Sequence, residues 1–354
     1  MSAMMQAARF HAPKSPLSLE TMPIPEIKAH ETLIEVRACG LCGTDLHIAR
    51  EGTIPTAKVP ITLGHEVAGV ITQTGSDVQD WRVGDRVAVY PHEPCGACSV
   101  CRSGHEALCP NTRILGLHID GGFAQFLKIR ADCLFRLPSC IPFEQGAIIT
   151  DAVSTAFHAV TQRGRLEKGE RVAIFGCGGV GHQAIKIARF LEAQKILAVD
   201  VAEGALRRAQ EAGADELIDA RPGEPSRKIK ERTGGEGVDL AIECVGLKST
   251  VAEAMKSLKR GGRLVILGVG NERVELPPLR VFVGTECCVM GSMGFSRQDA
   301  RTVIALVADG KLDLSSSVTA AWPLAQINEA IDQLEKRHGD PVRIVILPQE
   351  QKRT

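Results

Sequence analysis

The stretch RVAIFGCGGVGHQAIKIARFLEAQKILAVD, residues 171–200, alternates an apolar run, a helical pattern and a second apolar run. RVAIF and KILAVD are short apolar runs typical of strands buried on both faces, and apolar residues recur between them with helical spacing. The alternation continues through VDLAIECVG, STVAEAMKSLKRGG and RLVILGV. Strands alternating with helices in this way predict an α/β fold with a doubly wound parallel sheet.

Three glycines mark the first turn of this pattern. Gly176, Gly178 and Gly181 form G-x-G-x-x-G directly after a predicted strand and directly before a predicted helix. The first glycine permits the tight turn, the second lets a pyrophosphate approach the backbone, and the third lets helix and strand pack closely. The helix N-terminus then offers unpaired N–H groups to an anion. This context favours a dinucleotide site over a turn that merely joins a strand to a helix.

Asp200 ends the next predicted strand, nineteen residues after Gly181. A carboxylate at this place accepts hydrogen bonds from the adenosine ribose and repels a 2′-phosphate. The residues after it include no basic side chain before Arg207. We therefore expect NAD rather than NADP, with an exposed aspartate at a strand end as the plainer alternative.

Four cysteines lie within fifteen residues, in CGACSVCRSGHEALC. Four thiolates this close in sequence can surround one zinc ion tetrahedrally. An iron–sulfur site also uses four thiolates, but its common bacterial run leaves three residues before the last cysteine, whereas seven stand here. Disulfides are a second alternative, which a chain start without a secretory h-region disfavours. The spacing favours a structural zinc site formed by Cys95, Cys98, Cys101 and Cys109.

The composition excludes several classes of function. The chain has 354 residues, which suggests about two domains, and its 42 basic side chains balance 42 acidic ones. This balance and the 4% of aromatic residues argue against nucleic-acid binding. No run of 18 apolar residues predicts a membrane span. Twelve cysteines without a signal peptide predict a reducing compartment, and hence the cytoplasm.

The first 150 residues have a different pattern from the nucleotide region. Short β-like runs such as ETLIEVRACG, HEVAGVITQTG and RVGDRVAVYP are broken by Gly and Pro. This pattern predicts a compact, mostly antiparallel domain. The tail, from about Ser292, contains two helical patterns and a last strand, VRIVIL, which we expect to return to the first domain.

Taken together, the motifs resemble the zinc-dependent alcohol dehydrogenases of the medium-chain dehydrogenase/reductase superfamily. The resemblance covers nearly the whole chain and rests on GLCGTDLH, GHE, the four-cysteine lobe, DGGFAQF, GCGGVG and ECVG. It implies a GroES-like, mostly-β catalytic domain over 1–152, with the zinc lobe at 91–112. It also implies a Rossmann NAD-binding domain over 153–291 and a return of 292–354 to the catalytic domain.

The resemblance further implies a catalytic zinc, so that each chain holds two zinc ions. Cys42 and His65 match two of its ligands. The third ligand is a cysteine in many relatives, whereas Asp151 stands at the matching position here, with a helix N-cap as its alternative role. Carboxylate oxygen is an accepted zinc ligand. Glu66 resembles a family glutamate that approaches the metal from the side.

By the same resemblance, the reaction is hydride transfer between an alcohol and NAD. Thr44 matches the hydroxyl that takes the substrate proton, and His47 could pass that proton to solvent, or could be only a surface histidine. Asp45 is expected to orient His65 through its carboxylate. The residues expected to contact the cofactor are Gly176, Gly178, Gly179, Val180, Gly181, Asp200, Thr155, Val269 and Arg343.

The apolar segment VFVGTECCVMGSM, residues 281–293, is expected to be strand-like and to pair across a two-fold axis, which predicts a homotetramer or a homodimer. The mostly apolar positions expected in the cleft suit an aliphatic or alicyclic alcohol. The alternatives are a polyol or hydroxyacyl dehydrogenase of the same superfamily, a zinc-free quinone or enoyl reductase, and a NAD-binding protein without catalysis.

Overall fold

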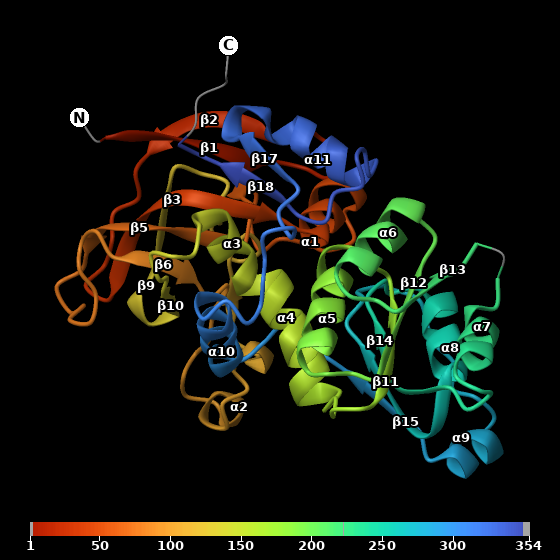
Figure 1. Cartoon of the computed structure of the whole chain (residues 1–354). Helices are drawn as coiled ribbons and strands as arrows, with labels where there is room; N and C mark the ends of the chain where they lie inside the picture. Colours follow the sequence, from red (N-terminus) through yellow and green to blue (C-terminus); the bar gives the residue numbers. More distant parts are fainter. Residues whose placement is uncertain (1–2, 222, 350–354) are drawn as a thin grey trace. The chain divides into compact units, whose positions relative to one another are not determined.

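The computed structural model describes residues 3–221 and 223–349 and divides the chain into two compact units (Figure 1). One unit, called the catalytic unit after the resemblance, comprises the described residues within 1–152 and 296–354. The other, the nucleotide unit, comprises residues 153–295. The final segment of the chain therefore lies in the same unit as the first segment.

The nucleotide unit is built on six parallel strands in the order β13-β12-β11-β14-β15-β16. This is the order of a doubly wound sheet, whose direction of winding reverses between β11 and β14. The α/β fold predicted from the sequence is confirmed. The strands are β11 (Arg171–Phe175), β12 (Lys195–Asp200), β13 (Glu216–Asp219), β14 (Val238–Glu243), β15 (Leu258–Ile266) and β16 (Cys288–Gly291).

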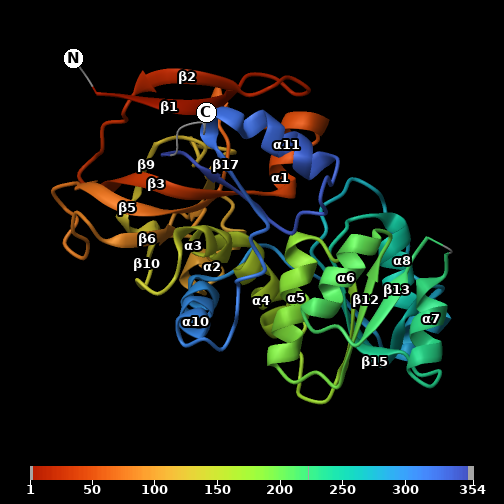
Figure 2. The ribbon, with the colours of Figure 1, turned by 45° about the horizontal axis from the view of Figure 1, so that its top comes forward.

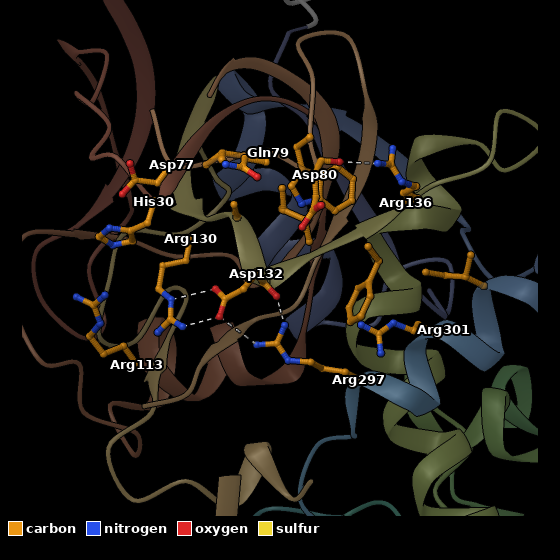
Figure 3. Close-up of a pocket in the computed structure, with 16 residues that line it drawn as sticks. His30, Asp77, Gln79, Asp80, Arg113, Arg130, Asp132, Arg136, Arg297 and Arg301 are labelled. Atoms are coloured by element: carbon orange, nitrogen blue, oxygen red, sulfur yellow. Dashed lines mark hydrogen bonds and ion pairs between the residues drawn. The ribbon is translucent and has the colours of Figure 1, made fainter. Parts of the chain in front are cut away.

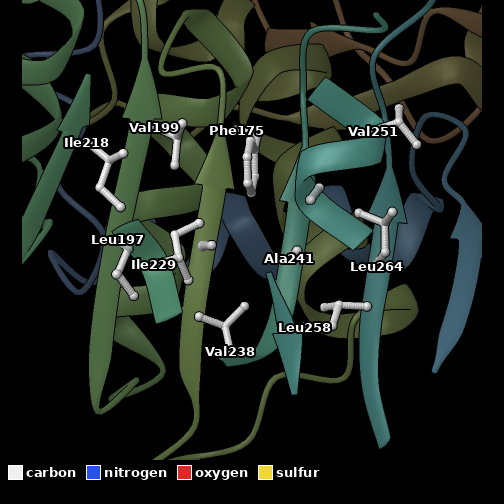
Figure 4. Close-up of a cluster of buried hydrophobic side chains, with 12 residues drawn as sticks. Phe175, Leu197, Val199, Ile218, Ile229, Val238, Ala241, Val251, Leu258 and Leu264 are labelled. Atoms are coloured by element: carbon white, nitrogen blue, oxygen red, sulfur yellow. The ribbon is translucent and has the colours of Figure 1, made fainter. Parts of the chain in front are cut away.

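One face of this sheet packs against α7 and α8 to form an apolar core (Figure 4). Phe175 and Leu197 from the central strands meet Ile229 of α7 and Val251 of α8, and all four side chains are buried. The sequence did not indicate β13 or α7, because β13 is short and α7 is mostly charged. The helices of the unit are α4 (Ser154–Phe157), η5 (His158–Arg163), α5 (Gly179–Phe190), α6 (Glu203–Glu211), α7 (Pro225–Arg232), α8 (Lys248–Lys256) and α9 (Leu279–Thr285).

The predicted strand over residues 281–293 is wrong for its first half. Residues Leu279–Thr285 form the short helix α9, and only Cys288–Gly291 forms a strand, β16, which pairs with β15. Pro278 stands directly before this helix and has no N–H, so it cannot donate to a strand ladder at this point. Leu279 and Val283 are exposed on this helix, at 72% and 70%.

The catalytic unit is mostly antiparallel β-structure, as the resemblance implied (Figure 2). A seven-stranded sheet runs β10-β6-β5-β3-β18-β17, with β9 also paired to β3, and a three-stranded sheet runs β2-β1-β4. The last strand, β18, pairs with β3, so the C-terminal segment completes the sheet of the first domain. The large-sheet strands are β3 (Glu31–Leu41), β5 (Glu66–Thr74), β6 (Arg86–Val89), β9 (Phe126–Arg130), β10 (Leu134–Arg136), β17 (Ala320–Pro323) and β18 (Ile344–Leu347).

The remaining elements of this unit are two small sheets and its helices. The small sheets contain β1 (Met4–Phe10), β2 (Ser18–Pro23), β4 (Ile61–Thr62), β7 (His92–Glu93) and β8 (Arg113–Ile114). The helical elements are α1 (Gly43–Leu46), η1 (His47–Glu51), α2 (Ser99–Arg102), η2 (Glu106–Leu108), η3 (Ala131–Cys133), α3 (Phe143–Ile148), η4 (Ile149–Val153), α10 (Arg297–Ala308), η6 (Leu324–Gln326) and α11 (Ile327–Glu335). Figure 2 shows α11 beside β17 and α1.

Candidate functional site

Four side chains from distant parts of the catalytic unit form a compact cluster. Cys42 caps α1, His65 and Glu66 lie at the start of β5, and Asp151 lies in η4. One donor atom from each residue lies within 4.8 Å of the others. The Asp151 Oδ2 atom is 3.4 Å from Cys42 Sγ and 3.6 Å from His65 Nε2. Asp151 is inside a helical turn, so it is not the N-cap that the sequence left open.

The interactions among these four side chains stabilise positive charge and so favour a bound cation. Burial opposes protonation of His65, but its hydrogen bonds with Asp151 and Cys42 outweigh burial and place the pKa of His65 well above its usual value. Burial also opposes ionisation of Asp151, but His65 overrides it and lowers the pKa of Asp151. A thiolate, an imidazole and a carboxylate are the donor types that bind Zn²⁺. The donor set therefore fits a zinc ion.

Glu66 forms a buried ion pair with Arg343 at 3.1 Å, and neither side chain is more than 5% exposed. Burial raises the pKa of Glu66 well above its usual value, against the opposing charge of Arg343. A methyl group on Gly40 would lie 1.9 Å from Glu66 Oε2, so glycine at this position makes room for the carboxylate. The sequence did not indicate either contact, because Glu66 and Arg343 are 277 residues apart.

Asp45 does not hydrogen-bond to His65 in the described part of the chain. Asp45 Oδ1 and His65 Nδ1 are both buried without a hydrogen-bond partner there. Asp45 Oδ2 instead accepts the backbone N–H of Cys42 at 2.9 Å. The Asp45 carboxylate still acts on His65 through its charge, which helps to raise the pKa of His65, and it also holds the backbone of the Cys42 turn.

Two expected relay residues follow Cys42 on α1 and η1. Thr44 is half-buried, with its Oγ1 atom 3.8 Å from Cys42 Sγ. His47 begins η1, and its Nδ1 atom lies 2.8 Å from Glu51 Oε2. The structure therefore places Thr44 beside the Cys42, His65, Glu66 and Asp151 cluster and gives His47 a carboxylate partner.

The four lobe cysteines also converge. Cys98 Sγ lies 3.4 Å from Cys101 Sγ and 3.9 Å from Cys109 Sγ, and Cys95 Sγ lies 4.0 Å from Cys101 Sγ. Backbone N–H groups of Ala97 and Cys98 lower the pKa of Cys95 to about 6, which favours its thiolate. The α2 turn and the short η2 turn bring these thiols together. Four convergent thiols with this spacing match a closed tetrahedral zinc site.

The glycine loop of the nucleotide unit has the geometry that its sequence predicts. Gly176 has φ +86°, and a Cβ atom there would lie 2.6 Å from Val245 Cγ2. A Cβ atom on Gly181 would lie 1.8 Å from Gly176 O, whereas nothing lies within 4 Å of one on Gly178. Gly178 caps α5, and Gly179 and Val180 form its first turn. Space is therefore left at the glycine that would face a pyrophosphate.

Asp200 is joined directly to this loop. Its Oδ2 atom accepts the backbone N–H of Cys177 at 2.7 Å, and its Oδ1 atom accepts that of Ala202 at 2.9 Å. Val269 lies on the loop after β15 and is 61% exposed, and Thr155 lies in α4. The nucleotide unit thus presents the expected glycines and carboxylate together at the carboxyl ends of β11 and β12.

A cavity of about 1010 Å³ in the catalytic unit is unrelated to these sites (Figure 3). Four of its five arginines already have carboxylate partners: Arg130 binds Asp132 at 2.5 Å and Arg297 binds Glu106 at 2.7 Å. Arg113 binds Glu93, and Arg136 lies 3.2 Å from Asp85. Paired guanidinium groups have little remaining attraction for an anion, so the cavity is not assigned a ligand.

The chain matches two family models and many known proteins. Residues 28–139 match the alcohol dehydrogenase GroES-like domain, and residues 179–309 match the zinc-binding dehydrogenase domain. A sorbitol dehydrogenase from Bacillus subtilis is 34% identical over 97% of both chains. An alcohol dehydrogenase from Geobacillus stearothermophilus is 33% identical over 94% of this chain and 96% of its own.

A solved structure shares the whole architecture. A zinc-binding dehydrogenase from Sinorhizobium meliloti 1021, bound to NADP, superposes with a TM-score of 0.90 at 31% identity over 98% of this chain and 100% of its own. None of the helices formed by the described residues is both long and apolar enough to span a membrane. The chain therefore belongs to the zinc-dependent alcohol dehydrogenases of the medium-chain dehydrogenase/reductase superfamily.

Proposed function

We propose that this oxidoreductase is NAD-dependent, holds two zinc ions per chain, and transfers hydride between the cofactor and a small alcohol or its carbonyl product. The observation that supports this most is the convergence of Cys42, His65, Glu66 and Asp151, with Thr44 beside them. A zinc ion held there supplies Lewis acidity that favours loss of the alcohol proton.

The chain's own residues divide the remaining work. Thr44 is proposed to hydrogen-bond the substrate hydroxyl and receive its proton, and His47 is proposed to take that proton onward. Glu66 is proposed to bind the metal only when another ligand leaves, because Arg343 holds it in a buried ion pair. Arg343 is also proposed to approach the cofactor pyrophosphate, and Thr155, Val180 and Val269 to contact the nicotinamide. The lobe zinc of Cys95, Cys98, Cys101 and Cys109 is proposed to be structural.

A polyol is a second candidate for the substrate, favoured by one buried histidine. His92 is 5% exposed, and its Nδ1 atom has no hydrogen-bond partner in the described part of the chain. Burial lowers the pKa of His92 to about 4, so its ring is neutral, and its charge interactions include Asp151 and His65. A second substrate hydroxyl could satisfy this ring nitrogen, as a sorbitol-like substrate would.

The experiment that tests the proposal is NAD reduction by zinc-loaded protein with primary, secondary, cyclic and polyol substrates. Turnover of simple alcohols supports the main proposal, and a preference for polyols supports the second candidate. Tight NAD binding without turnover of any alcohol would contradict both and favour a binding protein without catalysis.

Asp200 is expected to set the preference for NAD over NADP. Its carboxylate is fixed by two backbone N–H groups, so it cannot easily turn away from a 2′-phosphate. Asp200→Gly should reduce the NAD preference, measured as a ratio of kcat/KM values, by on the order of tenfold, because repulsion of the phosphate is lost. A related protein has been solved with NADP bound, so kcat/KM has to be measured with both cofactors. Equal use of both cofactors by the unchanged enzyme would contradict this assignment.

The enzyme is also proposed to be a homotetramer, or else a homodimer. Strand β16 is the edge of the parallel sheet in the described chain, and Leu279 and Val283 of α9 are exposed. An uncovered strand edge with apolar neighbours favours pairing with a second copy. Light scattering at micromolar concentration should give two or four times the mass of one 38.0 kDa chain. A stable monomer would contradict the proposal.

A further inference from the structure

We propose that Glu51 is a positioning residue for His47, and that its carboxylate keeps the imidazole in the tautomer that can accept a proton at Nε2. The inference rests on the proposed function, in which His47 carries the alcohol proton onward. It adds a residue to which neither the sequence motifs nor the resemblance assigned a role.

The geometry of η1 brings the two side chains together. His47 and Glu51 are the first and last residues of this π-helical turn, and His47 Nδ1 lies 2.8 Å from Glu51 Oε2. A carboxylate can only accept, so Nδ1 must carry the hydrogen in this contact. The lone pair then lies on Nε2, for which the structure gives no hydrogen bond in the described residues.

The carboxylate is itself held by the turn that ends η1. Gly52 has φ +68°, and a Cβ atom there would lie 2.9 Å from Pro13 Cβ, so both the backbone and the space favour glycine. In this turn the Thr53 N–H donates a hydrogen bond to His47 O at 2.9 Å. Thr53 Oγ1 lies 3.3 Å from Glu51 Oε2 and can donate to the same oxygen that faces His47. Glu51 is therefore oriented from two sides.

Among the described residues, no lysine or arginine forms an ion pair with Glu51. Arg50, the adjacent residue, binds Asp332 at 2.5 Å and Glu335 at 3.3 Å, both on α11. Asp45 on α1 holds the Cys42 backbone. These contacts fasten η1 to α11 and leave the Glu51 carboxylate to His47.

The positioning role of Glu51 predicts the path of the proton through the His47 ring. The neutral ring accepts a proton at Nε2 while Nδ1–H stays bonded to Glu51, and the resulting imidazolium lies beside a carboxylate. The proton then passes from Nε2 to water, which restores the same tautomer. No bond to Glu51 is made or broken, so its contribution is orientation and charge.

The first test reads the tautomer directly. Protein labelled with ¹³C,¹⁵N-histidine is compared with its Glu51→Ala variant by NMR, with the His47 signals assigned from their loss in His47→Asn. The unchanged protein should show His47 in the Nδ1–H form, and Glu51→Ala should shift it toward a mixture. A matched control is Glu20→Ala, which removes the exposed His11–Glu20 contact of 2.6 Å and should leave the His47 signals unchanged.

The second test is a double-mutant cycle on alcohol oxidation. Glu51→Ala should lower kcat about three- to tenfold, the cost of one lost hydrogen bond, with KM for NAD unchanged. In the His47→Asn background the same change should cause no further loss. Glu20→Ala should leave kcat unchanged, and the unfolding temperature of each variant checks that it folds.

Two outcomes separate this inference from the proposed function. An unchanged His47 tautomer in Glu51→Ala, or an equal loss of kcat in both backgrounds, would overturn the positioning role while alcohol oxidation stands. Failure of the unchanged, zinc-loaded protein to oxidise any alcohol would overturn the proposed function, and the relay with it.

Discussion

Changing Asp151 to alanine is expected to reduce the bound zinc from two ions per chain to one and to lower alcohol turnover by on the order of 10³-fold. Asp151 Oδ2 is the atom on which Cys42 and His65 converge, at 3.4 Å and 3.6 Å. Without it, two protein donors and a glutamate bound to Arg343 remain, which is a poor site for Zn²⁺. Metal analysis by mass spectrometry and steady-state kinetics measure the two effects.

Two further variants show which ion is lost. Cys98→Ser should remove the lobe ion instead, because Cys98 Sγ lies within 3.9 Å of two other lobe thiols. Asp80→Ala, an exposed carboxylate of the same unit outside both clusters, should keep two ions and full turnover. Retention of two zinc ions by Asp151→Ala would show that Asp151 is not a ligand. Iron in the unchanged protein would overturn the zinc assignment itself.

Changing Gly181 to alanine is expected to raise the Kd for NAD at least tenfold and to destabilise the nucleotide unit by about 1–3 kcal/mol. The added methyl group would lie 1.8 Å from Gly176 O, a backbone atom that cannot move without reshaping the loop. That loop carries the N–H groups expected to bind the pyrophosphate. Isothermal titration with NAD and thermal unfolding measure both effects.

The control for this change is Gly284→Ala. Gly284 lies in α9 with nothing within 4 Å of an added Cβ atom, so the variant should bind NAD as the parent does. Gly181→Ala should still hold two zinc ions, because both metal clusters lie in the other unit. Normal NAD affinity in Gly181→Ala would show that the cofactor does not use this loop.

The sequence predicted the nucleotide sheet because its signals are local. Buried strands such as RVAIF and KILAVD are continuous apolar runs, and the observed β11 and β12 match them. The prediction failed for an element with few apolar residues and for a segment whose apolar residues form a helix instead of a strand. Helix α7 buries one large apolar side chain, Ile229, among charged neighbours, and residues 279–285 form a helix after Pro278 despite their apolar pattern.

The sequence by itself determined the sites whose residues are neighbours in the chain. Four cysteines within fifteen residues and three glycines within six can meet only at one turn each, so spacing alone predicts where each site forms and favours one chemistry for it. Only the tertiary structure decided the contacts between distant segments. It paired Glu66 with Arg343 and reserved space for Glu66 at Gly40. The contact of Asp45 with the Cys42 backbone and that of Glu51 with His47 are local, three and four residues apart, and they form because these residues adopt the α1 and η1 turns. The physical reason is that contacts between distant segments depend on strand pairing, which residue spacing does not record.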